Sequence, residues 1–248
     1  EHFDACAAAF GAEMGFDLRA EAFDGTGRNL ARTDRAQPAL FAVEYALAKL
    51  AESYGVRPSA LAGHSIGEWV AGTLAGVFDL PTAVKAVSMR ARLMHASARG
   101  VMVAVALGPA AIAAHLTPDV DLAAINDPGR CVVAGSEQAI RDFQARLAES
   151  GIVARRVRTA HAFHSRLMNP VIPEFTSFLS RLDLREPRIP LLSNVTGTWM
   201  TPGEATDPST WARQIRETVR FSDELDALLT DPARVVVEVG LGAMKAQA

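Results

Sequence analysis

The amino-acid sequence predicts an α/β protein, with a mostly parallel sheet covered by helices and a small four-stranded subdomain inserted into it. Three observations lead to this fold class. Apolar strand candidates alternate with helical stretches along most of the 248 residues. Gly63–Gly67 lies between a strand candidate and a helix candidate, and residues 101–158 contain a β-α-β-β-α-β series. Such alternation is typical of a parallel sheet with helices on both faces.

The N-terminal part is mainly helical by pattern. Leu40, Val43, Leu47 and Leu50 recur at helical spacing, and a short apolar segment leads into the turn at Gly63. The elements expected here are helices at 36–54, 68–76 and 81–99 and a strand at 59–62.

The middle of the chain changes to shorter elements. The expected strands are 101–107, 120–125, 131–134 and 152–158, and the expected helices are 109–116 and 136–150. This order is the split βαβ, or ferredoxin-like, arrangement. We therefore assign residues 100–159 to a ferredoxin-like small subdomain, and residues 1–99 and 160–248 to the large one.

The C-terminal part returns to longer alternating elements. Helices are expected at 166–182, 208–217 and 222–229, and strands at 189–195 and 234–239. The last of these is an apolar run that is typical of a buried strand and ends at Gly240.

Composition excludes several classes of function. A net charge of −3 offers no general basic field for nucleic acid. Charged residues interrupt every apolar run before the roughly 20 residues that a membrane span needs. Cys6 and Cys131 have neither metal-ligand spacing nor a disulfide pattern, so we expect no metal and a reducing cytoplasm. The chain begins at Glu1 without a targeting segment, and we interpret it as part of a longer protein.

Gly63-His64-Ser65-Ile66-Gly67 fits the G-x-S-x-G nucleophile elbow. The strand-to-helix context is the one that this motif requires, and it suggests a hydrolase-like large subdomain. Ser65 would be the nucleophile at a helix N-terminus, with the N–H of Ile66 as one oxyanion donor. The alternative is that Ser65 only caps the helix.

A serine nucleophile needs a base, and the pattern leaves two candidates. His161 and His164 lie in the loop where the chain leaves the small subdomain, whereas His64 is expected to pack behind the turn. Every aspartate between Ser65 and His164 falls in the small subdomain. A dyad whose histidine is oriented by a backbone carbonyl is therefore an expectation of the sequence.

Several motifs, in order, resemble the malonyl-CoA:acyl-carrier-protein transacylases and the acyltransferase domains of type I polyketide synthases. They are QPALFAVEYAL (37–47), GHSIGE (63–68), RARLM (90–94), AAINDPGRCVVAG (123–135), HAFHS (161–165), SNVTG (193–197) and EVG (238–240). Together they cover almost the whole chain. An ordered series of this kind is far more specific than one elbow.

The resemblance implies a role for each matching residue. Ser65 corresponds to the nucleophile, His164 to the base, and His161 to a selectivity residue. Arg90 corresponds to the arginine that binds the free carboxylate of the acyl group, which a guanidinium can hold with two hydrogen bonds. By pattern alone it would be one arginine on a solvated helix. Gln214 corresponds to a glutamine whose backbone orients the histidine.

The resemblance also implies the substrate and the partners. HAFH accompanies malonyl units, because Phe163 would crowd a methyl group on C2, and Ile66 resembles the branched residue of malonyl enzymes. The implied reaction moves malonyl from malonyl-CoA through a malonyl-serine to the phosphopantetheine thiol of an acyl carrier protein. No bound cofactor is expected, and neighbouring synthase domains are expected partners.

Some features depart from the family pattern or leave alternatives open. The family's Gly-Gln-Gly loop, which supplies a second oxyanion donor, would precede Glu1, while Thr218, Arg166 and Leu241 replace prolines. A serine thioesterase or hydrolase could use the same elbow, and an inactive structural domain is a further alternative. Four arginines near HAFHS could dock an acidic carrier protein or form a solvated face: Arg155, Arg156, Arg158 and Arg166.

Overall fold

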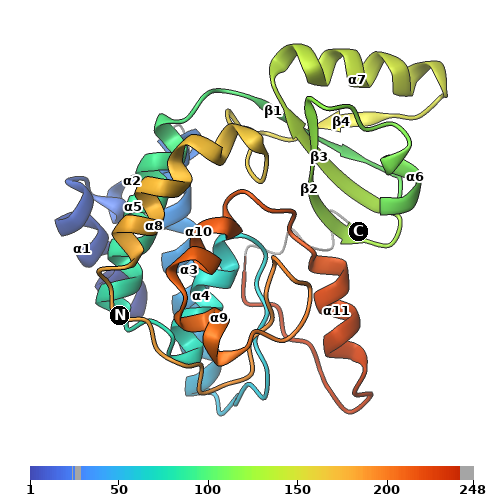
Figure 1. Ribbon diagram of the computed structural model, residues 1–248. Coiled ribbons are helices and arrows are strands. Elements are labelled where there is room, and N and C mark those ends of the chain that lie inside the picture. The colour runs from blue at the N-terminus through green and yellow to red at the C-terminus, as the bar shows by residue number, and fades with distance from the viewer. Residues whose placement is uncertain (24, 26–28, 241–248) are drawn as a thin grey trace.

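The computed structural model describes residues 1–23, 25 and 29–240. It consists of a helical part and a four-stranded sheet flanked by α6 (Pro109–Ala113) and α7 (Glu137–Glu149) (Figure 1). The α/β class predicted from the sequence is confirmed. Position 241, where a leucine was expected to replace a proline, lies outside the described residues.

The helical part surrounds an aromatic core. Trp69, Phe78, Phe175 and Trp211 are fully or almost fully buried, and the two indole rings lie 4.9 Å apart. Its elements are α1 (His2–Met14), α2 (Leu18–Phe23), η1 (Asn29–Ala31), α3 (Thr33–Ser53), α4 (Ile66–Ala75), α5 (Leu80–Ala96), η2 (Arg166–Val171), α8 (Ile172–Leu179), α9 (Pro202–Thr206), α10 (Pro208–Gln214) and α11 (Phe221–Leu229).

The helix expected at 166–182 is divided into two elements. It begins as the 3₁₀ segment η2 and continues as α8. Pro170 lies inside η2 and Pro173 in the first turn of α8, and neither residue has an N–H for an α-helical hydrogen bond. The two prolines explain why one regular helix does not form.

The small sheet has the arrangement that the sequence predicts. Its strands are β1 (Val101–Val105), β2 (Val120–Asp127), β3 (Arg130–Gly135) and β4 (Ala154–Arg156), all paired antiparallel in the order β2-β3-β1-β4. β4 is shorter than the expected 152–158. Val103, Val133, Ile140 and Phe143 form part of the core between the sheet and α7.

The predicted parallel sheet of the large subdomain is not present as regular strands in the described residues. Segments 59–62 and 189–195 meet in one parallel bridge, between Leu61 and Leu191. Segment 234–239 forms no strand, and 87% of Val235 is exposed. A strand exists only where its backbone groups pair with a neighbour, and the apolar sequence alone cannot supply that neighbour. The prediction of a buried strand at 234–239 is therefore wrong for the described structure.

The chain crosses between the two parts where the segments ending at Arg99 and beginning at His161 lie side by side. These residues form an antiparallel bridge, and the N–H of Gly100 donates to the carbonyl of Ala160 at 3.2 Å. The proposed boundaries at 99/100 and 159/160 remain a prediction. The bridge places HAFHS directly at this crossing.

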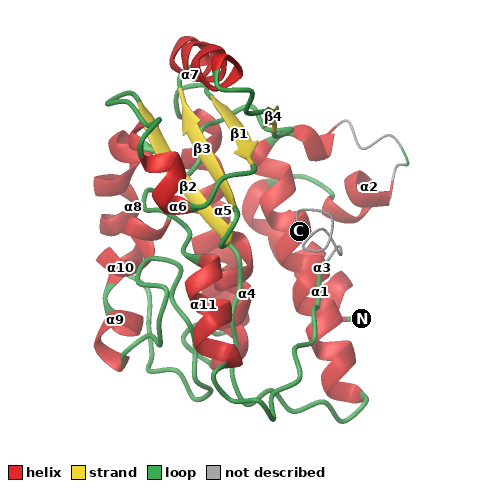
Figure 2. Ribbon diagram, turned by 90° about the vertical axis from the view of Figure 1, so that its right-hand side faces the viewer, coloured by secondary structure: helices red, strands yellow, loops and turns green. Residues whose placement is uncertain are grey.

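The loop before α11 pairs with the edge of the sheet. Val219 donates to the carbonyl of Ala123 and accepts from the N–H of Ile125, both at 2.9 Å. Thr218, at a position where the family has proline, donates its hydroxyl to the carbonyl of Leu122 at 2.7 Å. α11 consequently packs beside β2 (Figure 2).

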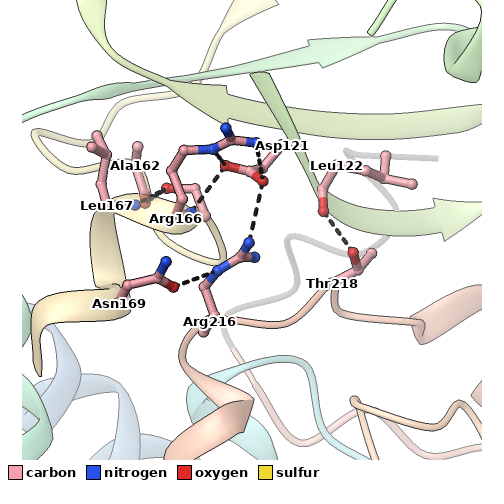
Figure 3. A network of polar contacts seen from close by, with 9 residues as sticks. Asp121, Leu122, Ala162, Arg166, Leu167, Asn169, Arg216 and Thr218 are labelled. Carbon is pink, nitrogen blue, oxygen red and sulfur yellow. Dashed lines mark hydrogen bonds and ion pairs between the residues drawn. The ribbon is translucent and has the colours of Figure 1, made fainter. Parts of the chain in front are cut away.

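Asp121 on β2 joins the sheet to two arginines of the helical part (Figure 3). It accepts hydrogen bonds from the backbone N–H and guanidinium of Arg166 at 2.9–3.1 Å, and from Arg216 at 3.4 Å. Arg216 also donates to Asn169 at 2.8 Å. The pKa of Asp121 is lowered because these hydrogen bonds and charges outweigh the desolvation of its carboxyl group.

Asp121→Ala is expected to lower the free energy of unfolding by roughly 2 kcal/mol, because it leaves two arginines without their charged acceptor. Urea unfolding would measure the change. Glu149→Ala, at the exposed end of α7, is the control and should have little effect. Equal stability of the Asp121 variant and the wild type would show that the network contributes nothing.

Candidate active site

Ser65 lies at a sharp, strained turn immediately before α4. Its φ is 55° and its ψ is −104°, a conformation that residues with a side chain rarely adopt. A Cβ on Gly63 would lie 2.1 Å from the backbone carbon of Gly67, so a side chain at Gly63 cannot fit. The G-x-S-x-G spacing thus reflects a close backbone approach that points the serine outward from the turn.

His164 contacts the serine directly. Its Nε2 lies 2.8 Å from Ser65 Oγ, and its Nδ1 lies 3.0 Å from the carbonyl oxygen of Glu217. Because a carbonyl only accepts, the proton is on Nδ1 and Nε2 is free to accept from the serine. The expected arrangement, a histidine oriented by a backbone carbonyl, is therefore the one observed. The acceptor of the Nδ1 hydrogen bond is Glu217, three residues beyond Gln214.

The base is uncharged in this environment. Burial lowers the pKa of His164 to about 3, and the positive charge of Arg90 acts in the same direction. The carbonyl groups of Glu217 and Gln214 oppose this shift, with a smaller effect. A neutral imidazole can take the serine proton without first losing one of its own.

Arg90 is buried beside the nucleophile instead of lying on a solvated helix face. It is 1% exposed, and its Nη2 donates to Ser65 Oγ at 3.0 Å. Its other contacts are with two glutamine side-chain oxygens, those of Gln37 and Gln214. No described carboxylate forms an ion pair with it. Burial lowers the pKa of Arg90 to about 9, against the opposing charge of Glu68.

Gln214 connects the arginine, the serine and the core through its side chain. Nε2 donates to the carbonyl of Ser65 at 2.7 Å, and Oε1 accepts from Arg90 at 3.4 Å and from the indole of Trp69 at 3.2 Å. The sequence indicated the position of Gln214 but assigned the interaction to its backbone. Gln37, which the sequence placed only within a motif, takes part in the same network.

Asn194, Glu68 and Glu224 belong to the site, although reasoning from the sequence assigned them no role. Asn194 Oδ1 accepts from the N–H of Ser65 at 2.7 Å, and its Nδ2 donates to Glu224 at 2.6 Å. Glu68 accepts from the backbone N–H of Asn194 at 3.1 Å. The motifs GHSIGE and SNVTG were the only signals, because both acids are remote from each other in sequence.

Both glutamates are buried acids without a cationic partner in ion-pair contact among the described residues. Burial raises the pKa of the Glu68 carboxyl well above its usual range. Burial also raises the pKa of Glu224, and the proximity of Glu68 adds to this effect. One oxygen of each carboxyl is buried and lacks a hydrogen-bond partner in the described structure. Both groups are therefore uncharged near neutral pH.

His161 and Phe163 form an aromatic surface next to the dyad. Their rings are stacked with centroids 5.9 Å apart, and Nδ1 of His161 lies 2.9 Å from the hydroxyl of Thr33. Ile66 begins α4, and its N–H donates to no acceptor within the described residues, which leaves it available to an oxyanion. His64 contacts the small subdomain instead, through a 2.9 Å hydrogen bond to Asn126.

Two of the four arginines near HAFHS are already engaged. Arg166 binds Asp121 and Arg156 binds Glu137, whereas Arg155 and Arg158 are exposed. Within the described ranges, no cluster of three potential metal ligands occurs. None of the helices that the structure describes is both long and apolar enough to cross a bilayer.

Comparison with known proteins gives this geometry a family. A family model described as acyl transferase domain matches residues 1–248. The chain belongs to the acyl transferase family. It is 58% identical over 242 residues to a component of the phenolphthiocerol/phthiocerol polyketide synthase of Mycobacterium tuberculosis, covering 98% of this chain and 16% of that protein. Polyketide synthase GfsB of Streptomyces halstedii is 40% identical over 86% of the chain, which spans 4% of its length.

Solved structures of the acyl transferase family have the same fold. The acyltransferase domain from the second module of the salinomycin polyketide synthase is 42% identical, with a TM-score of 0.92 over 99% of this chain and 58% of that one. Malonyl CoA-acyl carrier protein transacylase from Burkholderia pseudomallei is 31% identical, with a TM-score of 0.89 over 99% and 88%. The chain is thus an acyltransferase domain of the kind found in polyketide synthases.

Glu224→Gln is expected to make stability less dependent on pH. The raised pKa means that the folded protein keeps the Glu224 proton where the unfolded chain loses it. The contribution of Glu224 to stability is complete below its usual pKa of 4.5 and is lost as pH rises through the raised value. The stability of the variant relative to wild type should therefore increase from about pH 6 to about pH 9 in urea unfolding.

Asp226→Asn is the control for this measurement, because Asp226 lies on the exposed side of the same helix. Its stability difference from wild type should not change with pH in this range. A pH-independent difference for Glu224→Gln would mean that the buried carboxyl is ionised.

Proposed function

We propose that the chain transfers a malonyl group from malonyl-CoA to the phosphopantetheine thiol of an acyl carrier protein, through a malonyl-serine at Ser65. The observation that carries the proposal is the guanidinium of Arg90, which is buried 3.0 Å from Ser65 Oγ without a carboxylate partner among the described residues. An acyl group with a free carboxylate supplies that partner on reaching the serine. Fatty acyl and acetyl groups lack it.

The first half of the reaction forms the acyl-serine. Ser65 Oγ attacks the thioester carbon while its proton moves to Nε2 of His164, and the N–H of Ile66 donates to the oxyanion. The C–S bond breaks, and the proton passes from His164 to the sulfur of CoA. The carbonyl of Glu217 holds the imidazolium in place while it is charged.

The second half repeats these steps with a new thiol. The phosphopantetheine thiol gives its proton to His164 and attacks the malonyl-serine, and the proton then returns to Ser65. Arg90 holds the carboxylate through both halves. This reaction places the domain beside carrier and ketosynthase-type domains of a cytoplasmic synthase. Arg155 and Arg158 are the exposed cations of the group considered for carrier docking.

Phe163 is the proposed determinant of the extender unit. Its ring stacks on His161 and is only half buried, so one face remains available to an acyl group. A methyl group on C2 would meet this ring. The acyltransferase domain of SpnD, 39% identical, was solved in complex with 2-(pent-4-yn-1-yl)malonyl, so substitution at C2 is compatible with this fold in a relative.

A serine thioesterase or hydrolase is the second candidate, because the same elbow and base could activate water. The buried Arg90 favours transfer, since hydrolysis of a simple thioester needs no cation beside the nucleophile. The two activities differ in their products. Hydrolysis releases CoA and free acid without a thiol acceptor.

Malonyl-CoA is expected to form a covalent adduct that intact-mass spectrometry detects on the wild type and not on Ser65→Ala. Arg90→Ala should slow acylation by about 10² or more, because it removes the partner of a buried carboxylate. Arg90→Lys should be intermediate, since lysine keeps the charge but not the two-point geometry.

Exposed Arg213→Ala on α10 is the matched control and should acylate at the wild-type rate. Steady release of CoA with no adduct would favour the hydrolase. Neither an adduct nor CoA release would contradict catalysis altogether.

Phe163→Ser is expected to raise the kcat/KM ratio of methylmalonyl-CoA to malonyl-CoA by about tenfold, the usual scale for relieving one methyl clash. Competition between the two thioesters, read from the masses of the two adducts, would measure it. Phe163→Tyr keeps the bulk and should stay selective for malonyl. An unchanged ratio in Phe163→Ser would assign selectivity elsewhere.

A further inference from the structure

Asn194 holds both sides of the strained turn that carries the nucleophile. Its Oδ1 accepts from the N–H of Ser65 at 2.7 Å, and its Nδ2 donates to the carbonyl of Gly63 at 2.6 Å. The residue is 1% exposed, so water does not compete for these groups. One amide side chain therefore connects the strand side and the helix side of the elbow.

The second hydrogen of the same amide is bound to α11. It is donated to Oε1 of Glu224 at 2.6 Å, and Glu224 is fully buried. The backbone of Asn194 is bound as well: its N–H donates to Glu68 at 3.1 Å and its carbonyl accepts from Arg220 at 2.9 Å. The orientation of the amide is thus determined by three separate elements of the fold.

Asn194 also touches the hydrogen-bond network of Arg90. Gln214 Nε2 donates to the carbonyl of Ser65 at 2.7 Å and approaches Asn194 Oδ1 at 3.4 Å. The same glutamine accepts from Arg90 through its Oε1. A displacement of Asn194 would consequently move the serine and disturb the group that holds the arginine.

A strained φ/ψ pair persists only where its surroundings determine it from several directions. Ser65 has that conformation, and its hydroxyl must stay 2.8 Å from His164 to lose its proton. Asn194 reaches the turn without touching the hydroxyl itself. It can therefore affect the reaction only through the placement of Ser65.

We propose that Asn194 is a positioning residue for acyl transfer, and that an uncharged Glu224 carboxyl fixes its amide so that Ser65 remains directed at His164. The proposal rests on the serine intermediate of the proposed function and adds two residues that do not touch the substrate.

The uncharged state of Glu224 follows from its surroundings. The acidic groups near it are Glu68 on α4 and Asp223 on α11, and the described residues place no cation in ion-pair contact with it. Its Oε2 is buried and has no partner in the described structure. A charge there would lie close to a second buried acid, and burial together with that acid raises its pKa. Glutamine has the shape of the protonated acid and keeps the acceptor that Asn194 uses.

Single-turnover acylation by malonyl-CoA, followed by intact mass, tests the proposal. Asn194→Ala should lower the rate at saturating malonyl-CoA by about 10², the cost of a misplaced reacting group. The concentration for half-maximal rate should change little, because Asn194 does not touch the substrate. Asn169→Ala, an exposed asparagine on η2, is the control.

The pair Glu224→Gln and Glu224→Ala tests the carboxyl. The alanine variant should lower the saturating rate by about tenfold, because a buried amide hydrogen loses its acceptor. The glutamine variant should lower it much less. If Asn194→Ala does not fold in circular dichroism, this pair decides the question. Equal rates for the pair and the wild type, or a wild-type rate in folded Asn194→Ala, would overturn the proposal.

Labelling of Ser65 by a fluorophosphonate separates this inference from the proposed function. The reagent needs the serine and its base but not the malonyl site. If the wild type reacts with it and forms no malonyl adduct, the proposed substrate is wrong, and the role of Asn194 is still decided by slower labelling of its variant. Equal labelling of the wild type and Asn194→Ala would overturn the positioning role.

Discussion

The strained backbone at Ser65 is the constraint on which the rest of the site depends. Gly63 and Gly67 approach so closely that a Cβ at Gly63 would overlap backbone atoms. The turn places the hydroxyl at the start of α4 and within hydrogen-bond reach of His164. Because such a conformation has no intrinsic preference, contacts from distant segments must hold it. Asn194 and Gln214 make those contacts, one on each side of the serine backbone.

The electrostatics of the site are set by burial more than by pairing. Arg90, Glu68, Glu224 and His164 are all almost fully buried, yet the described residues form no ion pair among them. Desolvation favours the uncharged form of the two acids and of the histidine. Arg90 then remains the positive group beside the nucleophile. An anionic acyl group is consequently the ligand that best completes the charge balance of this acyltransferase domain.

The site also depends on contact between the two parts of the molecule. His164 follows the crossing at Arg99 and His161, and its carbonyl partner Glu217 lies two residues before Val219, which pairs with β2. Asp121 adds a charged connection through Arg166 and Arg216 (Figure 3). The position of the base is therefore supported from the sheet as well as from the helices.

The sequence by itself determined the helices, the ferredoxin-like order of the small sheet and the identity of Ser65, because these depend on local pattern and turn chemistry. It indicated Arg90 and His164 only through the resemblance to a family, since isolated arginines and histidines carry no positional pattern. The strand expected at 234–239 was wrong, because an apolar run becomes a strand only beside a pairing partner. The tertiary structure alone decided the burial of Arg90, the Glu217 carbonyl on His164 and the contact of Asn194 with Glu224. Each of these joins segments far apart in the sequence, and hydrogen bonds and desolvation depend on distance in space.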